Sequence, residues 1–464
     1  METEEQYRDH ISTVNEQGKR VWLFPKKPKG SLTNKRKWVS YSLILFLFLA
    51  PHLKMNGEQL LLFNIIERKF IFFGSIFWPQ DLYLIAILLI VGIVFVVLFT
   101  IIYGRLFCGW VCPQTIFMEF VFRQIEYWID GDSAEQRKLA KDPWNGTKIF
   151  KRVLKYTIFW IISFLIANTF LAYIIGSEEL WKIQTEGLTS HVGGFLSIII
   201  FTTVFFFVFV YLREQVCTTI CPYGRLQGVL LDQNSMIVAY DYVRGEKRAK
   251  FKKNEDRKEA DKGDCIDCNQ CVQVCPTGID IRNGTQLECT NCTACIDACN
   301  TIMLGVGLEK GLIRFESENG IKNRTGFEWT PRVKGYTALL IGLIALLAVL
   351  LSTRKDFSTI IIRQRGSTYQ LTSDDKISNI FEIDLRNKTR KKYKISFDCP
   401  DKSVEIKLTT DKLLLKPESK LKDRIVLITP YNTFKSGKKV VEINIYGNGK
   451  KIDDVSLKMI APSY

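Results

Sequence analysis

Long apolar runs recur through the first three quarters of the chain. Five of them stand out, at roughly 38–54, 81–103, 153–175, 192–212 and 335–351. A helix that spans a bilayer needs about 17–25 mostly apolar residues, so the second, third and fourth runs fit best and the other two are short. The pattern predicts an α-helical transmembrane bundle of about five helices.

After the last run, the pattern changes to a period of two. Residues 355–464 contain short alternating runs such as IFEIDLRN, YKISFD and VVEINIYGNG, separated by turn residues. This spacing is typical of a small antiparallel β-sandwich. The region holds one cysteine, Cys399, and no histidine, so it offers no catalytic constellation.

Lysine and arginine alternate between the two sides of the predicted spans. Segments 1–37 and 104–152 carry nine and eight of them, whereas 55–80 and 176–191 carry two and one, and 213–334 is rich again. Basic loops stay on the cytoplasmic side of a membrane. We therefore expect a cytoplasmic N-terminus and an outer C-terminal domain. Because the first segment is polar, we expect no cleavable signal peptide.

Composition narrows the class of protein. The 464 residues are 47% hydrophobic and 24% charged, with a net charge of +16. The apolar content excludes a disordered chain, and its clustering excludes a single soluble globule. A basic soluble protein would suggest nucleic-acid binding. Here the charge lies in loops that orient the spans, so we expect the lipid bilayer, and no nucleic acid, as a partner.

Twelve of the thirteen cysteines lie in short motifs. Eight of these twelve lie in two tracts that are close together in the sequence. CIDCNQCVQVCP (265–276) and CTNCTACIDAC (289–299) share the spacing C-x2-C-x2-C-x3-C. In two-cluster ferredoxins the fourth cysteine of such a run binds the other [4Fe–4S] cluster. The alternative, a pair of zinc sites, usually has a longer gap between its C-x2-C units. The predicted ligands are Cys265, Cys268, Cys271 and Cys299 for the first cluster, and Cys289, Cys292, Cys295 and Cys275 for the second.

Two further cysteine pairs, CGWVCP (108–113) and CTTICP (217–222), each follow a predicted span. Both have the form C-x3-C-P, and a helical turn would place the two sulfurs of each pair on one face. We expect the four to form one thiolate site at the cytoplasmic membrane face, which holds either a third Fe–S cluster or Cu(I), an ion that prefers soft ligands. The alternative is four buried, inert thiols. These residues are Cys108, Cys112, Cys217 and Cys221.

The histidines and the aromatic residues at span ends carry weaker signals. We expect His10 to be solvated, and His52 and His191 to be polar residues at the outer ends of spans. A relay of metal ions through His52 and Met55 is the alternative. Tryptophans at span ends are typical of an interfacial belt. They are Trp38, Trp78 and Trp181.

Several longer stretches occur in order over most of residues 20–300. They include FPKKPKG (24–30), GRLFCGWVCPQTIFMEF (104–120), REQVCTTICPYGRLQG (213–228) and YDYVRGEKR (240–248), and they run into the cysteine tracts. Together they resemble the FixG/RdxA/CcoG family of cytochrome c oxidase accessory proteins, which are membrane polyferredoxins. The C-x3-C-P pairs taken alone also resemble those of NapH- and NosR-type membrane ferredoxins.

The resemblance implies a protein of the bacterial inner membrane that acts in the maturation of a cbb3-type cytochrome c oxidase. The activity it implies is reduction of Cu(II) to Cu(I) for the copper centre, with oxidase subunits or copper chaperones as partners. It also implies that residues 355–464 form an immunoglobulin-like domain in the periplasm. Where the family more often has an aromatic residue after Pro51, this chain has His52.

The residues themselves are compatible with that chemistry. Clusters in the cytoplasm can accept single electrons, and a thiolate site would bind copper and favour Cu(I). No G-x-G-x-x-G follows a predicted strand, so we expect a separate cytoplasmic electron donor. Two alternatives are an electron-transfer subunit without copper chemistry, and an assembly scaffold whose clusters only stabilise the fold.

These observations predict a division of the chain into five parts. They are a basic cytoplasmic tail (1–37), four spans with both C-x3-C-P pairs (38–230), a cytoplasmic ferredoxin-like domain (231–334), a fifth span (335–351) and the outer β domain (355–464).

Overall fold

The computed structural model describes most of the chain, in two compact units. The described residues are 13–15, 17, 19–55, 57–66, 68–77, 81–186, 191–253, 255–257, 259–354, 356–366, 368–372, 375–389, 391–409, 413–417 and 419–462. One unit comprises residues 1–75 and 85–345, and the other residues 76–84 and 346–464.

Four helices in the described part of the chain are long and apolar enough to cross a membrane. They are α2 (Leu82–Tyr103), α7 (Gly146–Ile175), α9 (Val192–Phe207) continued by the π-helix η3 (Val208–Leu212), and α15 (Pro331–Ser352). They confirm the second to fifth predicted spans. Helix α7 begins seven residues before the expected position, because the side chain of Asn145 accepts the backbone N–H of Lys148 and caps the helix there.

The first predicted span has different bounds. Helix α1 covers Ser31–Leu49 instead of 38–54, and its first turns carry Lys35, Arg36 and Lys37. It ends shortly before Pro51, because helices usually end at or before the residue that precedes a proline. With these cations α1 is not among the four apolar helices.

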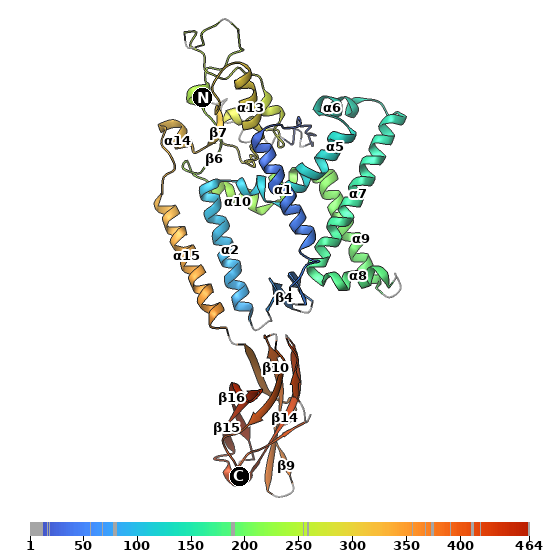
Figure 1. The fold of residues 1–464 in the computed structure, drawn as a ribbon, viewed down its shortest axis with the longest axis vertical. Helices are drawn as coiled ribbons and strands as arrows, with labels where there is room; N and C mark the ends of the chain where they lie inside the picture. The colour runs from blue at the N-terminus through green and yellow to red at the C-terminus, as the bar shows by residue number, and fades with distance from the viewer. Residues whose placement is uncertain are drawn as a thin grey trace. The chain divides into compact units, whose positions relative to one another are not determined.

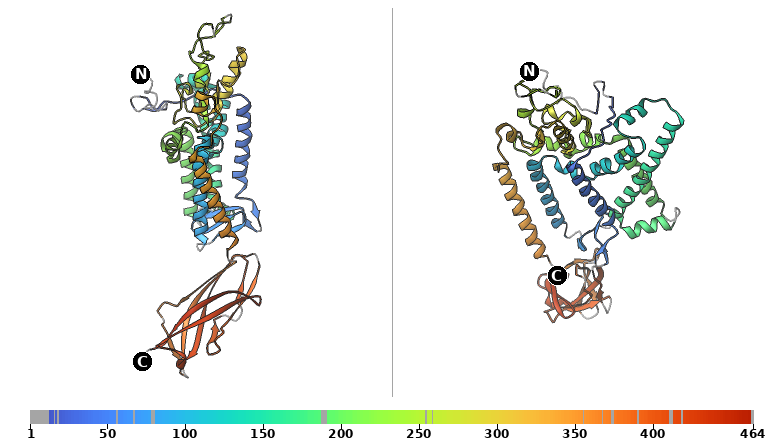
Figure 2. Two further views of the ribbon diagram at one scale, coloured as in Figure 1. Left: turned by 90° about the vertical axis from the view of Figure 1, so that its left-hand side faces the viewer. Right: turned by 45° about the horizontal axis from the view of Figure 1, so that its top comes forward.

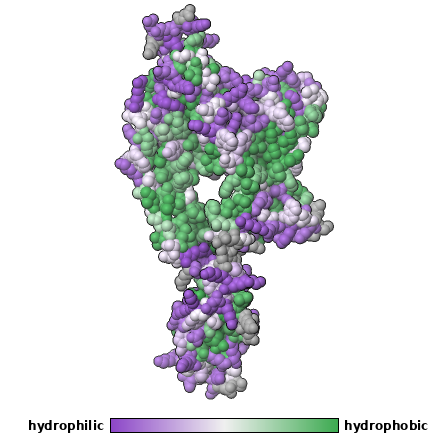
Figure 3. Space-filling view, viewed as in Figure 1, coloured by the Kyte–Doolittle hydropathy of each residue, from purple (hydrophilic) through white to green (hydrophobic). Residues whose placement is uncertain are grey.

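The helical part of this unit packs around aromatic side chains. Phe122, in the π-helix η2 (Met118–Phe122), stacks on Phe209 of η3 with ring centroids 4.2 Å apart, and meets Phe159 of α7 edge-on at 4.7 Å. Phe48 of α1 packs against the same cluster. The apolar side chains gather over these helices, as the green band in Figure 3 shows.

A cysteine-rich segment lies at one end of the helices (Figures 1 and 2). Strand β6 (Ile237–Tyr240) pairs antiparallel with β7 (Ile313–Glu316), so the two ends of this segment are held together. Between them, α12 (Gln270–Gln273) lies within the first cysteine tract, and α13 (Ala294–Gly305) begins within the second. At the opposite end of the helices lie a small sheet in which β3 (Leu61–Asn64) pairs with β4 (Lys69–Phe72), and helix α8 (Ser177–Thr185), neither of which the sequence pattern predicted.

The remaining elements of this region are short. They are β1 (Lys54–Met55), β2 (Glu58–Gln59), β5 (Ser75–Phe77), α3 (Leu106–Trp110), α4 (Pro113–Phe117), α5 (Arg123–Ile129), α6 (Ser133–Lys141), η4 (Val216–Ile220), α10 (Pro222–Leu230), α11 (Tyr242–Gly245), η5 (Ile281–Asn283) and α14 (Glu318–Asn323).

The second unit is the predicted β-sandwich. One sheet has the order β12-β14-β10-β8, with β9 also paired to β10, and the other has the order β13-β11-β15-β16. Side chains such as Ile383, Ile425 and Ile443 alternate into the core between the sheets. The strands are β8 (Phe357–Arg363), β9 (Gln370–Thr372), β10 (Lys376–Asn387), β11 (Tyr393–Asp398), β12 (Glu405–Leu408), β13 (Leu413–Leu415), β14 (Lys420–Pro430), β15 (Lys438–Gly447) and β16 (Lys450–Ile460), with the 3-10 turn η6 (Tyr431–Thr433).

Candidate functional site

The eight tract cysteines line two neighbouring cavities. We call the first, with Cys265, Cys268, Cys271 and Cys299, the first thiol pocket. The second thiol pocket contains Cys275, Cys289, Cys292 and Cys295, and Cys271 borders it as well. Each pocket thus takes three cysteines from one tract and the fourth from the other, which is the grouping that crossed ligands require.

The backbone of the two tracts repeats an unusual conformation. Asp267 and Asn269 have φ values of +52° and +55°, and the equivalent residues Asn291 and Thr293 have +51° and +65°. Residues other than glycine seldom adopt positive φ. When residues in the right- and left-handed helical conformations alternate, successive backbone N–H groups point into one concavity. Such a concavity suits an anionic group and is common at Fe–S sites. The two tracts therefore fit [4Fe–4S] clusters.

Burial alone would keep the sulfurs of Cys271 and Cys299 neutral. Burial, with a smaller contribution from nearby Cys268, raises the pKa of both thiols to about 12. A metal cation reverses this preference, since a coordinating thiol is deprotonated. Among the described residues, no three His, Cys, Asp or Glu side chains converge as a single metal ion requires. A cubane makes a different demand, because each of its four thiolates binds a different iron.

The C-x3-C-P pairs have a common local structure that differs in one respect from the prediction. Cys108 lies within α3, but Cys112 has φ −60° and ψ 123° and forms the N-cap of α4. Cys221 has nearly the same conformation, with φ −67° and ψ 115°, and caps α10. The second cysteine of each pair therefore leaves the helical turn, because the residue before a proline is pushed toward the extended region.

The four C-x3-C-P cysteines nevertheless lie near one another. Burial, with smaller contributions from the neighbouring thiols of Cys112 and Cys108, raises the pKa of Cys217 to about 12. Burial likewise raises the pKa of Cys112, where Cys108 and Cys221 add to the effect. The structure thus brings the two pairs together.

Two polar side chains, which the sequence pattern did not single out, contact these sulfurs. The fully buried side chain of Gln227, on α10, places its amide nitrogen 3.4 Å from the Cys108 sulfur. The Thr115 hydroxyl lies 3.9 Å from the sulfur of Cys217. Each contact joins one C-x3-C-P segment to the other, and only the tertiary fold creates it.

Helix α3 packs against the second cysteine tract with almost no space between their backbones. A side-chain carbon placed on Gly109 would lie 2.4 Å from the carbonyl oxygen of Thr290 and 3.1 Å from the backbone of Cys292. The guanidinium of Arg36 donates to the Gly109 carbonyl at 2.6 Å. The amide of Asn291 donates to the carbonyl of Tyr103 at 3.5 Å, at the end of α2. The second thiol pocket is therefore the one next to the C-x3-C-P cysteines.

The second tract also completes the first helix of the chain. Gly30, the N-cap of α1, has no side chain to satisfy the first backbone N–H groups. The carboxylate of Asp297 accepts the backbone N–H groups of Leu32 and Thr33 at 3.2 and 2.7 Å, and also the Thr33 hydroxyl at 2.7 Å. Asp297 lies between Cys295 and Cys299, so α1 and the tract are fixed to each other.

A chain of buried ion pairs lies beside the second C-x3-C-P segment and was not predicted from the sequence. Arg213 pairs with Glu126, which is 3.5 Å from Lys155 of α7, and Arg123 is 3.5 Å from Glu214. Burial alone would raise the pKa of Glu126, but Arg213 and Lys155 hold it below its usual range. Arg213 also has φ +53°, so these pairs hold a strained turn just before Cys217.

The other residues considered in the sequence take no part in these sites. His191 lies 2.8 Å from the carboxylate of Glu186, and His52 is exposed. Cys399 packs at the edge of the sandwich core. Trp38 and Trp181 are largely exposed. His10 and Trp78 lie outside the described residues.

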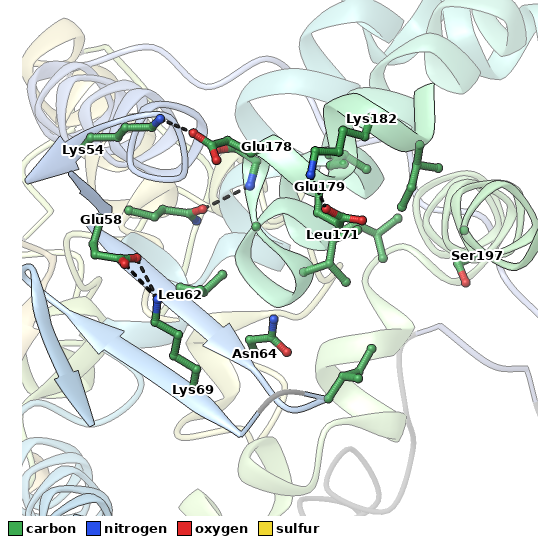
Figure 4. A pocket seen from close by; sticks show the side chains of 18 of the residues that line it. Lys54, Glu58, Leu62, Asn64, Lys69, Leu171, Glu178, Glu179, Lys182 and Ser197 are labelled. Carbon is green, nitrogen blue, oxygen red and sulfur yellow. Dashed lines mark hydrogen bonds and ion pairs between the residues drawn. The ribbon is translucent and has the colours of Figure 1, made fainter. Parts of the chain in front are cut away.

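A separate pocket of about 590 Å³ lies at the other end of α7 and α9 (Figure 4). Its lysines are already paired: Lys69 with Glu58 at 2.9 Å, Lys182 with Glu179 at 3.2 Å, and Lys54 with Glu178. Neither cysteine nor histidine is among the described residues that line it. We therefore assign it no part in the redox chemistry.

Apolar helices of spanning length, together with cysteine tracts folded for iron–sulfur clusters, define a membrane-bound iron–sulfur protein that transfers electrons. Family models agree: those described as "4Fe-4S binding domain" and "4Fe-4S dicluster domain" match residues 85–132 and 212–318. A model described as an IG-like fold at the C-terminus of FixG matches residues 347–462. The predictions of two [4Fe–4S] clusters and of an immunoglobulin-like domain are thereby confirmed.

Relatives of known name place the chain in a family. It is 33% identical over 384 residues to Protein RdxB of Cereibacter sphaeroides, and the aligned region covers 80% of each chain. It is 33% identical over 383 residues to Protein RdxA of the same organism, which covers 79% of this chain and 80% of the relative. The nitrogen fixation protein FixG of Rhizobium meliloti is 36% identical over 303 residues, 64% of this chain and 57% of that one. The chain belongs to the FixG/RdxA family.

Proposed function

We propose that this protein reduces Cu(II) to Cu(I) at the C-x3-C-P cysteines, for the copper centre of a cbb3-type cytochrome c oxidase. A cytoplasmic reductant loses one electron for each copper ion that gains one. The bound clusters supply the capacity to hold and pass single electrons. The close packing of Gly109 on Thr290 and Cys292 supports the proposal best, because it joins the second tract to the segment that carries Cys108.

The four sulfurs of the C-x3-C-P cysteines suit copper in its reduced form. Thiolates are soft ligands that prefer Cu(I), so a site built from them makes the reduction of Cu(II) more favourable. Gln227 and Thr115 contact Cys108 and Cys217 and would hold the sulfurs in position. The family membership supports oxidase subunits or copper chaperones as recipients of the product.

The proposed ligand sets are those that line each cavity. Cys265, Cys268, Cys271 and Cys299 would hold the first cluster. Cys289, Cys292, Cys295 and Cys275 would hold the second.

The crossed assignment predicts an asymmetric result when one cysteine is replaced. Cys275→Ser should lose the cluster of the second thiol pocket, about four Fe per chain, and keep the other, because its sulfur lines the second pocket. Iron analysis and EPR of the reduced protein measure this, with Cys399→Ser as the control. Loss of the first pocket's signal, with the second retained, would show that the ligands are not crossed.

A third cluster is the competing occupant of the C-x3-C-P cysteines. One observation favours it: the family model that matches residues 85–132, around Cys108 and Cys112, is described as a 4Fe-4S binding domain. Metal analysis of anaerobically purified protein separates the two possibilities. About eight Fe per chain with bound copper supports the copper site, whereas about twelve Fe supports a third cluster.

The activity itself is tested with reduced protein in detergent and a chelator that reports Cu(I). Formation of Cu(I) in proportion to the electrons supplied supports the proposal. If the protein carries its iron and accepts electrons but forms no Cu(I), it is an electron-transfer subunit. If a variant without clusters still supports oxidase assembly, the chain is a scaffold. The electron donor is proposed to be a separate cytoplasmic protein.

We further propose an inner-membrane location, with the N-terminus and the cysteine tracts in the cytoplasm. The support is the basic charge of 1–37 and 104–152 compared with 55–80 and 176–191. An impermeant maleimide should then label Cys399 in spheroplasts, and tags at residues 5 and 250 should be protected. Labelling of Cys399 only after permeabilisation would place the β domain inside; Cys399→Ser controls for reaction at other thiols.

A further inference from the structure

Arg105 is a buried cation between the second cysteine tract and the second C-x3-C-P segment. Its side chain is 4% exposed and donates to the carbonyl of Leu287, two residues before Cys289. Its other terminal nitrogen lies 3.2 Å from the position that a side-chain carbon on Gly224 would take, and the Cys217 carbonyl lies 2.5 Å from that position. Arg105 thus lies between the segment that precedes Cys289 and the backbone of the second C-x3-C-P segment.

Arg105 differs from the other buried arginines near the site in having no carboxylate partner. Arg123 pairs with Glu119, and Arg213 with Glu126. Among the described residues no aspartate or glutamate forms an ion pair with Arg105, and its Nε has no hydrogen-bond acceptor. Burying a cation without an anion is strongly unfavourable, so the fold implies that negative charge is present beside it.

The nearby groups that can carry this charge are the metal-binding sulfurs. Leu287, whose carbonyl accepts from Arg105, lies two residues before Cys289, and the backbone of Cys217 lies beside the same guanidinium. One buried cation therefore lies between the tract that supplies the second thiol pocket and the second C-x3-C-P segment.

The first thiol pocket has a cation too, but a neutralised one. Arg282 borders that pocket, and it pairs at 2.6 Å with both Asp280 and Asp267. Arg244 pairs with Asp264, which immediately precedes Cys265 of that pocket. Uncompensated positive charge is thus found beside the second pocket and compensated charge beside the first.

We propose that Arg105 is a positioning residue that supplies the counter-charge for the second cluster and makes that cluster easier to reduce than the first. Each reduction adds one negative charge, and a nearby buried cation stabilises it more than a screened surface charge would. An electron that enters the protein is thereby drawn to the side where the C-x3-C-P cysteines lie. This inference rests on the two ligand sets proposed above and does not depend on copper chemistry.

The test is a reductive titration with dithionite, followed by EPR, of the complete protein in detergent. Arg105→Met should lower the equilibrium constant for reducing the second cluster about tenfold, which is a fall of about 59 mV for one electron. The first cluster should not shift. Arg105→Lys, which keeps the charge, should restore the wild-type value. Arg225→Met removes an exposed arginine of α10 and should shift neither cluster.

The other possible results also test the proposed role of Arg105. An unchanged potential in Arg105→Met, or an equal shift of both clusters, would overturn the proposal. Arg105→Gln keeps a donor for the Leu287 carbonyl without the charge, so a wild-type potential in this variant would assign the effect to the hydrogen bond. If Arg105→Met and Arg105→Gln each lose about four Fe per chain and Arg105→Lys keeps its iron, the second cluster needs a cation at this position, as proposed. Loss of about four Fe from all three variants would contradict the proposal.

Discussion

Replacing Cys108 with serine is expected to lower copper reduction about 100-fold or more, since even residues that only support a metal ligand are worth about 10- to 100-fold in affinity. Cys217→Ser should do the same. The double variant should be scarcely worse than either single one, because residues that act as one unit are not additive when removed. The structural reason is that the two sulfurs come from different segments, and that Cys108 lies close enough to Cys217 to raise the pKa of the Cys217 thiol.

The measurement is formation of Cu(I) by the reduced variants, with iron content determined on the same samples. Cys399→Ser is the matched control, because it removes a thiol from the β-sandwich and should leave both quantities unchanged. Wild-type copper reduction in both single variants, with full iron content, would refute the copper site. Loss of about four Fe from each would instead assign a third cluster to these cysteines.

Gly109→Ala is expected to destabilise the protein by about 1–3 kcal/mol, the usual cost of forcing atoms into a filled space. The added carbon would meet the backbone of Thr290 and Cys292, which cannot move aside as a flexible side chain can. Displacing the tract should also slow electron transfer to the C-x3-C-P cysteines, because a misplacement of about 1 Å can cost about 100-fold in rate.

Gly92→Ala is the matched control for this prediction. Gly92 lies within α2 and has nothing within 4 Å of the position where the new carbon would be. The stability of that variant should stay within about 1 kcal/mol of wild type. Thermal unfolding and hydrogen exchange of the amides in 289–295 measure both variants. If the two behave alike, the close packing of α3 on the tract is wrong.

Patterns that repeat along the chain predicted most of the fold. The spans follow from uninterrupted apolar runs, and the β-sandwich follows from period-two alternation between turns. Both signals are local, because each element buries a regular set of its own side chains. The first span was misplaced, since the apolar run from 38 to 54 does not reveal that the polar residues of 31–37 also form helix.

The parts of the site that sequence reasoning missed come from contacts between distant segments. Gln227 resembles any other polar residue of a short helix until the fold places it beside Cys108. Arg105 looked like one more cation in a basic loop, and only its burial without a carboxylate sets it apart. One sequence signal could have indicated the buried ion pairs: an ionisable residue next to an apolar run, as at Glu126, Arg213 and Lys155. Such residues are rarely fully buried unless they are paired.

The cap that Asp297 provides for α1 has a consequence for the time course of synthesis. Thr33 and Asp297 are separated by 264 residues. Synthesis proceeds at about 5–20 residues per second, so roughly 13–53 s pass between the synthesis of α1 and the synthesis of the carboxylate that caps it. Throughout that interval the backbone N–H groups of Leu32 and Thr33 lack this acceptor. Because Asp297 lies between Cys295 and Cys299, the capping of α1, the first helix to be synthesised, coincides with the folding of the last cysteine tract to be synthesised.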